Sequence, residues 1–462
     1  MTFRTTLLAA LLSAAPAAAQ VPQGWQAVPA KLVETNAGGV LEDLSAFVPC
    51  PAPSGVFLFE AGRDWRYEVK DGSTLELFLG GKKGTVVKEG EPVKLAAQPP
   101  GERAPVKLVF RRLASAIEGA PAVRAAQVVV AKAGSKTFTF IDIDSNGYFD
   151  DWGVDAVLEG DPKELEKESG DTNRANMRTF HGELSAGGSR FLATLRPATT
   201  LLLWPITEKI PQESAQHMGY LNYLRRQCGL GPVGIDEPLS EGCAKHASYC
   251  KKNGPTHDEN KNLDGYTPEG ERAGKGSTFI ESNDVLEGLQ RMLKYFYERA
   301  PYLRPNLRKV GLGWADGYYM CEMRTYSDRT ILNPPLLYPA DRQARVDPQA
   351  KPGNPDPKPA GLDSIEGTFI VATFAQDTRP ELVEATLRDV TNDAAVEVVC
   401  STPKSPPPAA RAEYPDNGSC ICICPRIELR NDTIYEVVLR YKVRAEAPVE
   451  ERKWRFKTRP PV

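Results

Sequence analysis

The sequence predicts a multidomain α+β protein whose β-rich regions flank a central helical segment. Short apolar and β-branched runs recur before residue 205 and after residue 362, and Gly, Pro and Asp clusters separate them, as in strands joined by turns. Between these regions, residues 211–300 repeat apolar side chains at helical spacing. A chain of 462 residues has room for about two to four domains with separate cores.

Composition and charge exclude several classes of protein. With 41% hydrophobic and 25% charged residues, the chain has the balance of a folded globular protein rather than of a disordered one. Its formal net charge of −3 argues against nucleic acid as a partner, because nucleic-acid-binding domains usually carry a basic face. We also expect no transmembrane segment, since no apolar run approaches the about 20 residues that a spanning helix needs.

The first 19 residues have the three parts of a signal peptide. Arg4 gives a short positive start, residues 7–12 form an apolar run, and Ala17–Ala19 make a small-residue cleavage site. We therefore expect residues 1–19 to be removed and the remainder to be secreted, either into the extracellular space or into the periplasm and cell envelope.

Export makes the nine cysteines candidates for disulfide bonds, and their odd number leaves at least one unpaired within the chain. Cys243 and Cys250 share a helical face but are spaced too far apart to bond each other. The Cys-x-Cys-x-Cys segment 420–424 points its thiols to one side of a strand. It either binds a soft metal or, in the interpretation we favour, lies in a buried strand with one bridge to Cys400.

Residues 20–205 predict one or two β-sheet domains, and the residues alone do not decide between these alternatives. Turn clusters separate the runs, and Pro99–Gly101 marks one connection. The runs expected to form strands are residues 55–59, 74–79, 106–110, 127–130 and 137–140.

One loop of this region, residues 142–155, has the spacing of a calcium site. Oxygen-bearing side chains stand at its first, third and fifth positions, glycine at the sixth and Asp150 at the ninth. The twelfth position is Gly153 rather than the glutamate of an EF-hand, so Asp151 or Asp155 would have to complete the ligand shell. The alternative is a turn closed by Asx hydrogen bonds, with no ion. The full set of candidate calcium ligands is Asp142, Asp144, Asn146, Asp150, Asp151 and Asp155.

The central segment predicts helices followed by strands. Ser282–Asp284 can cap the start of the third helix, and Pro301 is expected to end it. Strands then return at residues 310–314 and 318–323. The three amphipathic helices are expected at residues 212–230, 239–250 and 285–296.

The C-terminal part predicts a linker and a further β domain. Residues 338–361 are rich in Pro, Gly and Lys, which is typical of a stiff, extended linker. Residues 362–462 then contain runs typical of a β-sandwich of roughly 100 residues. The expected strands are residues 368–374, 396–400, 435–441 and 454–458.

Several short motifs follow one another in the central segment: Leu221-Asn222 with Arg225, Gly229-Leu230, His246–Tyr249, His257, Gly265–Gly270 and Pro305–Gly313. In this order they resemble the CAP superfamily in its bacterial branch, which is the secreted family of cysteine-rich secretory, antigen 5 and pathogenesis-related proteins. The similarity covers roughly residues 212–326, and we assign the CAP-like domain to residues 211–330. It implies an α/β/α sandwich with a cleft, in a secreted protein.

In this family the cleft often carries two histidines and two glutamates that can hold a divalent metal. By resemblance, His257 matches the first histidine, Glu298 stands where bacterial members have the second, and Glu287 is the nearest candidate for the helical glutamate. Residues 271–274 depart from the family's Gly-Glu-Asn. The three remaining ligands would leave a fourth position open, as a catalytic zinc requires. The alternative is a solvated, charged face on which Glu287 caps its own helix.

A second resemblance concerns the C-terminal part. Tyr338-Pro339, the linker after it, and Trp454–Thr458 are similar to the bacterial Ig-like domains that follow some CAP modules. This similarity implies an extracellular spacer or contact module without catalysis.

The sequence leaves three hypotheses for the function. The first, which we favour, is a secreted, non-enzymatic binding module for an unidentified protein, lipid or glycan. The second is a metal-dependent hydrolase that uses His257 with Glu287 and Glu298, and the third is a calcium-dependent adhesion or cell-wall protein. The sequence contains no Gly-x-Ser-x-Gly elbow, phosphate loop or dinucleotide fingerprint. His246 is expected to be a packed or hydrogen-bonded histidine rather than a ligand.

Overall fold

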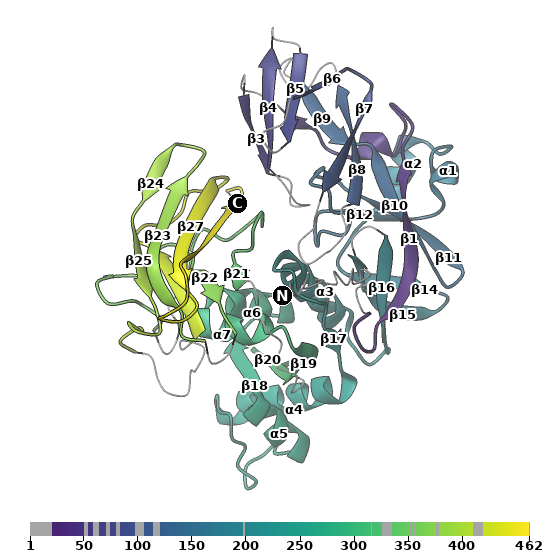
Figure 1. The fold of residues 1–462 in the computed structure, drawn as a ribbon. Helices are drawn as coiled ribbons and strands as arrows, with labels where there is room; N and C mark the ends of the chain where they lie inside the picture. The colour runs from purple at the N-terminus through teal and green to yellow at the C-terminus, as the bar shows by residue number, and fades with distance from the viewer. Residues whose placement is uncertain are drawn as a thin grey trace, which may run out of the picture.

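The structure, a computed structural model, contains helices that lie between two β-rich regions (Figure 1). Within the residues it describes, no helix combines the length and the apolar character needed to cross a membrane. The predicted signal peptide, residues 1–19, lies outside these residues. The structure describes residues 21–49, 54–58, 64–70, 74–79, 84–97, 106–113, 121–196, 199–315, 317–325, 335–351, 353, 356–375, 378–409 and 419–461.

The N-terminal region, residues 21–206, consists mainly of antiparallel sheets. Its elements are β1 Gln26–Glu34, η1 Glu42–Leu44, β2 Val48–Pro49, β3 Ser54–Leu58, β4 Asp64–Lys70, β5 Thr74–Leu79, β6 Thr85–Val87, β7 Pro92–Ala97, β8 Val106–Leu113, β9 Ala122–Ala125, β10 Gln127–Ala133, β11 Lys136–Ile141, β12 Ala156–Glu159, α1 Pro162–Leu165, α2 Gly170–Asn176, β13 Arg178–Thr179, β14 Glu183–Ala186, β15 Ser189–Arg196 and β16 Thr200–Ile206. The largest sheet has eight strands in the order β13-β12-β11-β10-β1-β16-β15-β14. Two four-stranded sheets have the orders β2-β9-β8-β7 and β3-β4-β5-β6. Each of the five strands expected in this region corresponds to one of these.

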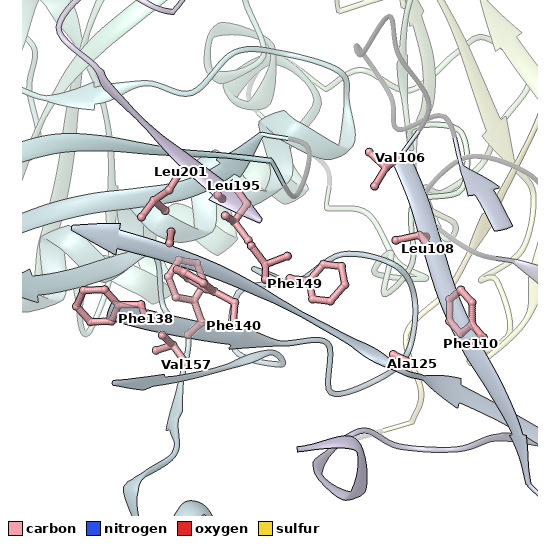
Figure 2. Close-up of a cluster of buried hydrophobic side chains, with 14 of the residues drawn as sticks. Val106, Leu108, Phe110, Ala125, Phe138, Phe140, Phe149, Val157, Leu195 and Leu201 are labelled. Carbon is pink, nitrogen blue, oxygen red and sulfur yellow. The ribbon is translucent and has the colours of Figure 1, made fainter. Parts of the chain in front are cut away.

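The three N-terminal sheets share one hydrophobic core. Its buried members include Leu75 of β5, Leu108 of β8 and Phe138 of β11, so every sheet contributes to it. Figure 2 shows part of this cluster, including Phe138, Phe140 and Phe149. Because a fully buried Leu or Phe side chain contributes about 1.5–3 kcal/mol by leaving water, the shared core favours folding of the three sheets as one unit.

The central unit, residues 212–325, has three layers. Its elements are α3 Gln212–Gln227, β17 Gly234–Ile235, α4 Glu237–Asn253, α5 Pro268–Gly276, β18 Ser277–Glu281, α6 Val285–Lys294, α7 Phe296–Tyr302, β19 Leu307–Ala315 and β20 Tyr318–Thr325. The sheet order is β17-β19-β20-β18. Tyr319 and Cys321 of β20 pack with α3, α6 and α7, whereas Met320 packs with α4 and α5. Since side chains alternate across a strand, the two groups of helices cover opposite faces of the sheet.

Two glycines allow α4 to lie directly on β19. A Cβ atom at Gly311 would come within 2.4 Å of Leu239, and one at Gly313 within 2.3 Å of the backbone nitrogen of Ala244. Cβ atoms do not approach other atoms so closely. The Gly-Leu-Gly sequence is therefore required by close packing between helix and strand.

The third predicted helix is broken, and its expected end at Pro301 is wrong. The chain forms α6 and α7 instead, and Tyr295 between them is extended, with φ −88° and ψ 143°. Tyr295 forms an isolated β-bridge with Lys351, which explains the break. Pro301 lies inside α7. The predicted N-cap of the helix is confirmed, because the side chain of Asp284 accepts a hydrogen bond from the first turn of α6.

The central unit shares its core with the largest N-terminal sheet. Leu192 of β15 and Leu202 of β16 belong to the same buried cluster as Met218 of α3. A Cβ atom at Gly219 of α3 would lie 2.2 Å from the carbonyl oxygen of His181, so helix and N-terminal region touch backbone to backbone. This junction is therefore packed as closely as the interior of a domain.

The C-terminal part, residues 336–457, contains two four-stranded sheets around one core. Its strands are β21 Leu336–Tyr338, β22 Ile370–Thr373, β23 Glu381–Asp389, β24 Ala394–Val396, β25 Val398–Ser401, β26 Cys420–Pro425, β27 Ile434–Lys442 and β28 Glu450–Lys457. The sheet orders are β21-β22-β26-β25 and β24-β23-β27-β28. Ile370 and Ile423 of the first sheet pack against Val437 and Trp454 of the second. We call these two sheets the C-terminal sandwich; the Ig-like class stays a prediction.

The Pro-rich segment 338–361 does not act as a free spacer. Val346 is buried in the core of the C-terminal sandwich, and Asp347 pairs with Lys294 of α6 at 2.8 Å. The segment is therefore held against both the sandwich and the central unit, which limits their relative movement.

The predicted bridge to Cys400 is wrong, because none of the eight cysteines in the described residues forms a disulfide bond. Cys400 lies opposite Ile423 in the β25–β26 ladder and packs in the core between the two sheets. The thiols of segment 420–424 belong to a different cluster, on the other face of β26. Among the described residues these thiols also form no group of three that could hold a metal.

Candidate functional site

Three of the six predicted calcium ligands come together in the loop between β11 and β12. Oxygen atoms of Asp142, Asp144 and Asp155 lie within 4.8 Å of one another, the only such group of three potential metal ligands in the described part of the chain. Asp142 and Asp155 are completely buried. Burial and the charges of neighbouring carboxylates raise the pKa of all three groups, that of Asp144 to about 6.

The backbone of the loop folds around these carboxylates. Asp142 accepts hydrogen bonds from the backbone N–H groups of Asn146 and Gly147, at 3.1 and 2.8 Å. Gly147 has a positive φ of 90°, a conformation that residues with a Cβ atom rarely adopt. Asp144 differs from its neighbours, because its Oδ1 is buried and has no hydrogen-bond partner. A cation between the three carboxylates would supply that partner.

Asp150 and Asp151 lie outside this group of three, and of the two residues that could complete the shell Asp155 is the one that joins it. Asp150 and Asp151 form ion pairs with Arg226 at the end of α3, and both are almost completely buried. The guanidinium of Arg226 also lies over the ring of Tyr148, 4.3 Å from its centroid. Asn146 donates its side-chain amide to Asp151 at 2.6 Å. These aspartates therefore bind the central unit through charge-assisted hydrogen bonds.

The same loop contacts the C-terminal part of the chain. Asp144 accepts a hydrogen bond from the guanidinium of Arg345 at 2.8 Å. Arg345 lies in the Pro-rich segment and has a positive φ of 58°. The loop 142–155 is thus a place where all three parts of the protein meet.

The sequence did not predict either of these arginine contacts. Arg225 and Arg226 lie in the last turn of α3, and their position in the sequence indicates only two cations near the negative end of a helix. Arg225 does serve that kind of role, since it donates to the carbonyl oxygens of Tyr302 and Arg304 at 2.6 and 3.0 Å. No local signal distinguishes its neighbour Arg226, whose partners lie about 75 residues away in the sequence.

The structure does not bring His257, Glu287 and Glu298 together as a metal site. His257 is exposed, and its Nδ1 donates to the carbonyl oxygen of Gly274 at 2.8 Å. Glu287 accepts a hydrogen bond from the backbone N–H of Asn283 at 2.9 Å and so caps α6, as the alternative predicted. Glu298 lies on α7, beyond the helix break that separates it from Glu287, and burial raises its pKa. The three predicted zinc ligands therefore do not form a group that could hold a metal ion in the described structure.

A different histidine, His246 of α4, lies in a buried polar cluster. Its Nδ1 is 2.9 Å from Oε1 of Glu259, and its Nε2 is 2.9 Å from the carbonyl oxygen of Thr256. The thiol of Cys250, one helical turn along, is 3.6 Å from Nε2. Both His246 and Cys250 are completely buried. The expectation that His246 is a hydrogen-bonded histidine is confirmed.

This cluster resembles a cysteine–histidine–carboxylate triad, but it is buried away from solvent. The Thr256 carbonyl and the Glu259 carboxylate are both acceptors, so both ring nitrogens of His246 donate. Burial favours the neutral ring, but hydrogen bonds with Cys250 and Glu259 outweigh it and raise the pKa of His246 to about 8. Because His246 and Cys250 are both completely buried, no substrate reaches the thiol. The cluster is therefore arranged to hold structure, not to activate a nucleophile.

Comparison with protein families agrees with the resemblance noted in the sequence. Residues 218–323 match the CAP family, described as the cysteine-rich secretory protein family. The match runs from α3 to β20, so it falls on the central unit and on neither β-rich region. No curated protein matches the chain in sequence. The central unit is thus a CAP domain.

Among solved structures, an extracellular protein containing a SCP domain from Bacillus anthracis str. Ames aligns with 64% of this chain and 98% of its own, at 12% sequence identity and a TM-score of 0.23. A TM-score this low supports no inference about the arrangement of the domains. The assignment of the central unit depends on the family match.

Proposed function

We propose that this protein is a secreted, non-catalytic binding protein that presents a CAP domain between two β-rich regions. Its partner would be a protein, lipid or glycan outside the cell. CAP proteins are typically extracellular, which agrees with the signal peptide expected at residues 1–19.

The burial and the hydrogen bonding of His246 carry this proposal. His246 donates from both ring nitrogens, and His257 donates from Nδ1 to Gly274. These bonds hold residues 256–259 against α4 and α5. A side chain that acts as a base or metal ligand needs a free lone pair, and the known contacts of His246 leave none.

The protonation state of His246 gives a direct test. Nitrogen NMR of the full secreted chain should show both ring nitrogens protonated at pH 7, with a midpoint near pH 8. Zinc should not change these signals, and hydrolysis of ester, peptide and phosphodiester substrates should stay at background with or without zinc. His181→Ala, which alters a histidine outside the CAP domain, is the matched control for His257→Ala. Zinc-dependent hydrolysis that is lost in His257→Ala alone would overturn the proposal.

We further propose that the loop 142–155 binds a calcium ion through Asp142, Asp144 and Asp155. Three carboxylates within 4.8 Å repel one another when buried, and a divalent cation removes that repulsion. Calcium takes about six to eight oxygen ligands, so carbonyl oxygens and water would complete the shell. Because Asp144 also contacts Arg345, the ion would stabilise the place where the three parts of the chain meet.

Calorimetric titration of the calcium-free chain tests this second proposal. Calcium should bind with one-to-one stoichiometry, and at a hundredfold excess over its Kd it should stabilise the fold by about 2.7 kcal/mol, seen as a rise in Tm. Asp144→Ala should abolish both effects. Asp171→Asn is the matched control, because this aspartate of the same region is fully exposed on α2. Equal calcium binding by the wild type and Asp144→Ala would exclude the site.

A further inference from the structure

A cavity of ≈ 80 Å³ lies where the CAP domain meets the C-terminal sandwich. Helix α7 and the turn after it form one wall, and strands β21, β22 and β26 form the other. The wall is largely apolar. Its lining includes Phe296, Arg299, Leu303, Leu336, Val371 and Cys420.

Arg299 of α7 brings a buried positive charge to this wall, with only 4% of its surface exposed. Its Nη1 donates to the carbonyl oxygen of Leu293 at 3.3 Å, and its guanidinium carbon lies 3.8 Å from the ring centroid of Tyr338. Its Nη2 is buried and has no hydrogen-bond partner. Burial of a guanidinium is unfavourable unless its donors find acceptors. A ligand that accepts a hydrogen bond from this nitrogen would therefore be stabilising.

Among the residues that the structure describes, no carboxylate pairs with Arg299. Burial raises the pKa of Cys228 to about 12 and raises that of Tyr338, so both groups near Arg299 are neutral at pH 7. The cavity therefore combines apolar walls with the buried positive charge of Arg299.

We propose that this cavity binds a short-chain carboxylate, whose head pairs with Arg299 and whose tail lies against Phe296, Leu303 and Val371. Guanidinium and carboxylate match in geometry, and the pair strengthens where water is excluded. A cavity of ≈ 80 Å³ is about half the size of the ~150 Å³ cavities that accept benzene, which limits the ligand to a short chain of few carbons.

The site is separate from the sites discussed above. Helix α7 packs on the face of the CAP sheet opposite to α4, which carries His246. The carboxylate site therefore goes beyond the proposed function, and its failure would leave both the His246 argument and the calcium proposal unaffected.

Sodium butyrate is the probe for this site. Isothermal titration of the full secreted chain should show saturable one-to-one binding with a Kd on the order of 1 mM, as expected for a ligand with few heavy atoms. Butan-1-ol, which lacks the charge, and inorganic phosphate, which lacks the tail, should each bind at least about tenfold more weakly. Absence of saturable butyrate binding, or equal binding of butan-1-ol or phosphate, would overturn the proposal.

Two variants test whether butyrate binds in this cavity. Arg299→Met removes the charge at similar side-chain length, and Val371→Phe fills the space while Arg299 stays in place; each should weaken butyrate binding at least about tenfold. Arg291→Met is the matched control and should bind normally, since Arg291 lies on neighbouring α6 with its side chain 41% exposed. If Arg299→Met does not fold, Val371→Phe decides the test. Wild-type affinity in a folded Arg299→Met or Val371→Phe protein would contradict the assignment.

Discussion

The CAP domain meets each neighbouring region through a buried arginine, and the two arginines are satisfied in opposite ways. Arg226 of α3 extends into the N-terminal region, where Asp150 and Asp151 pair with its guanidinium. Arg299 of α7 faces the C-terminal sandwich, where it meets the ring of Tyr338 and a cavity. The first charge is neutralised within the chain, whereas the second has no anion among the described residues.

The N-terminal junction of the CAP domain is also more closely packed than the C-terminal junction. At the N-terminal junction, strands β15 and β16 share a core with α3, and Gly219 allows direct backbone contact. At the C-terminal junction, Phe296 packs against Phe369 but space remains beside Arg299. A buried arginine therefore holds two regions together at the N-terminal junction, where carboxylates and close packing surround it. At the C-terminal junction, where they do not, a buried arginine offers a binding site.

Among the variants that test this comparison, removal of the Arg226 charge should lower the free energy of unfolding most. Arg226→Met leaves two buried carboxylates without a cation, and we expect a loss of about 3–5 kcal/mol in the free energy of unfolding. Urea denaturation followed by tryptophan fluorescence measures it, with the partly exposed Arg291→Met expected to change stability by less than about 0.5 kcal/mol. A loss no larger than that of the control would show that the pair is not buried in solution.

A smaller effect is expected when the backbone contact of the same junction is disturbed. In Gly219→Ala the new Cβ atom would lie 2.2 Å from the carbonyl oxygen of His181, so α3 must shift, at a cost of about 1–3 kcal/mol. Thermal denaturation gives the shift in Tm. Gly231→Ala is the matched control because no atom lies within 4 Å of its added Cβ. Equal Tm values for the two variants would mean that the junction is looser than described.

The smallest effect is expected at the C-terminal junction in the absence of ligand. Arg299→Met replaces an uncompensated buried charge by an apolar side chain, so stability should stay unchanged or rise by about 1 kcal/mol. The same urea denaturation, performed without butyrate, measures it. A loss comparable to that of Arg226→Met would indicate that Arg299 has an anionic partner within the chain, and the contrast between the two arginines would disappear.

Local patterns predicted much of the fold. The helix expected at residues 239–250 is α4, and the strands expected before residue 205 and after residue 362 are present. The cap at Asp284 and the hydrogen-bonded state of His246 were also predicted. These features follow from periodicity and from contacts between residues close in sequence, which a single sequence displays directly.

The errors share a different cause. The third helix breaks at Tyr295 because Lys351 pairs with it. The expected bridge to Cys400 fails because that thiol faces the opposite side of the sheet from the thiols of segment 420–424. In each case a partner distant in the sequence, or a sheet register, decides the outcome.

By itself, the sequence determined that this chain alternates β-rich and helical regions, that its centre carries the motifs of a CAP domain, and that acidic residues cluster in the loop 142–155. Only the tertiary structure decided which of those acids face one another, and that Arg226 is neutralised while Arg299 is not. The physical reason is that propensity and periodicity act over a few residues, whereas the free energy of a buried charge depends on every group packed around it.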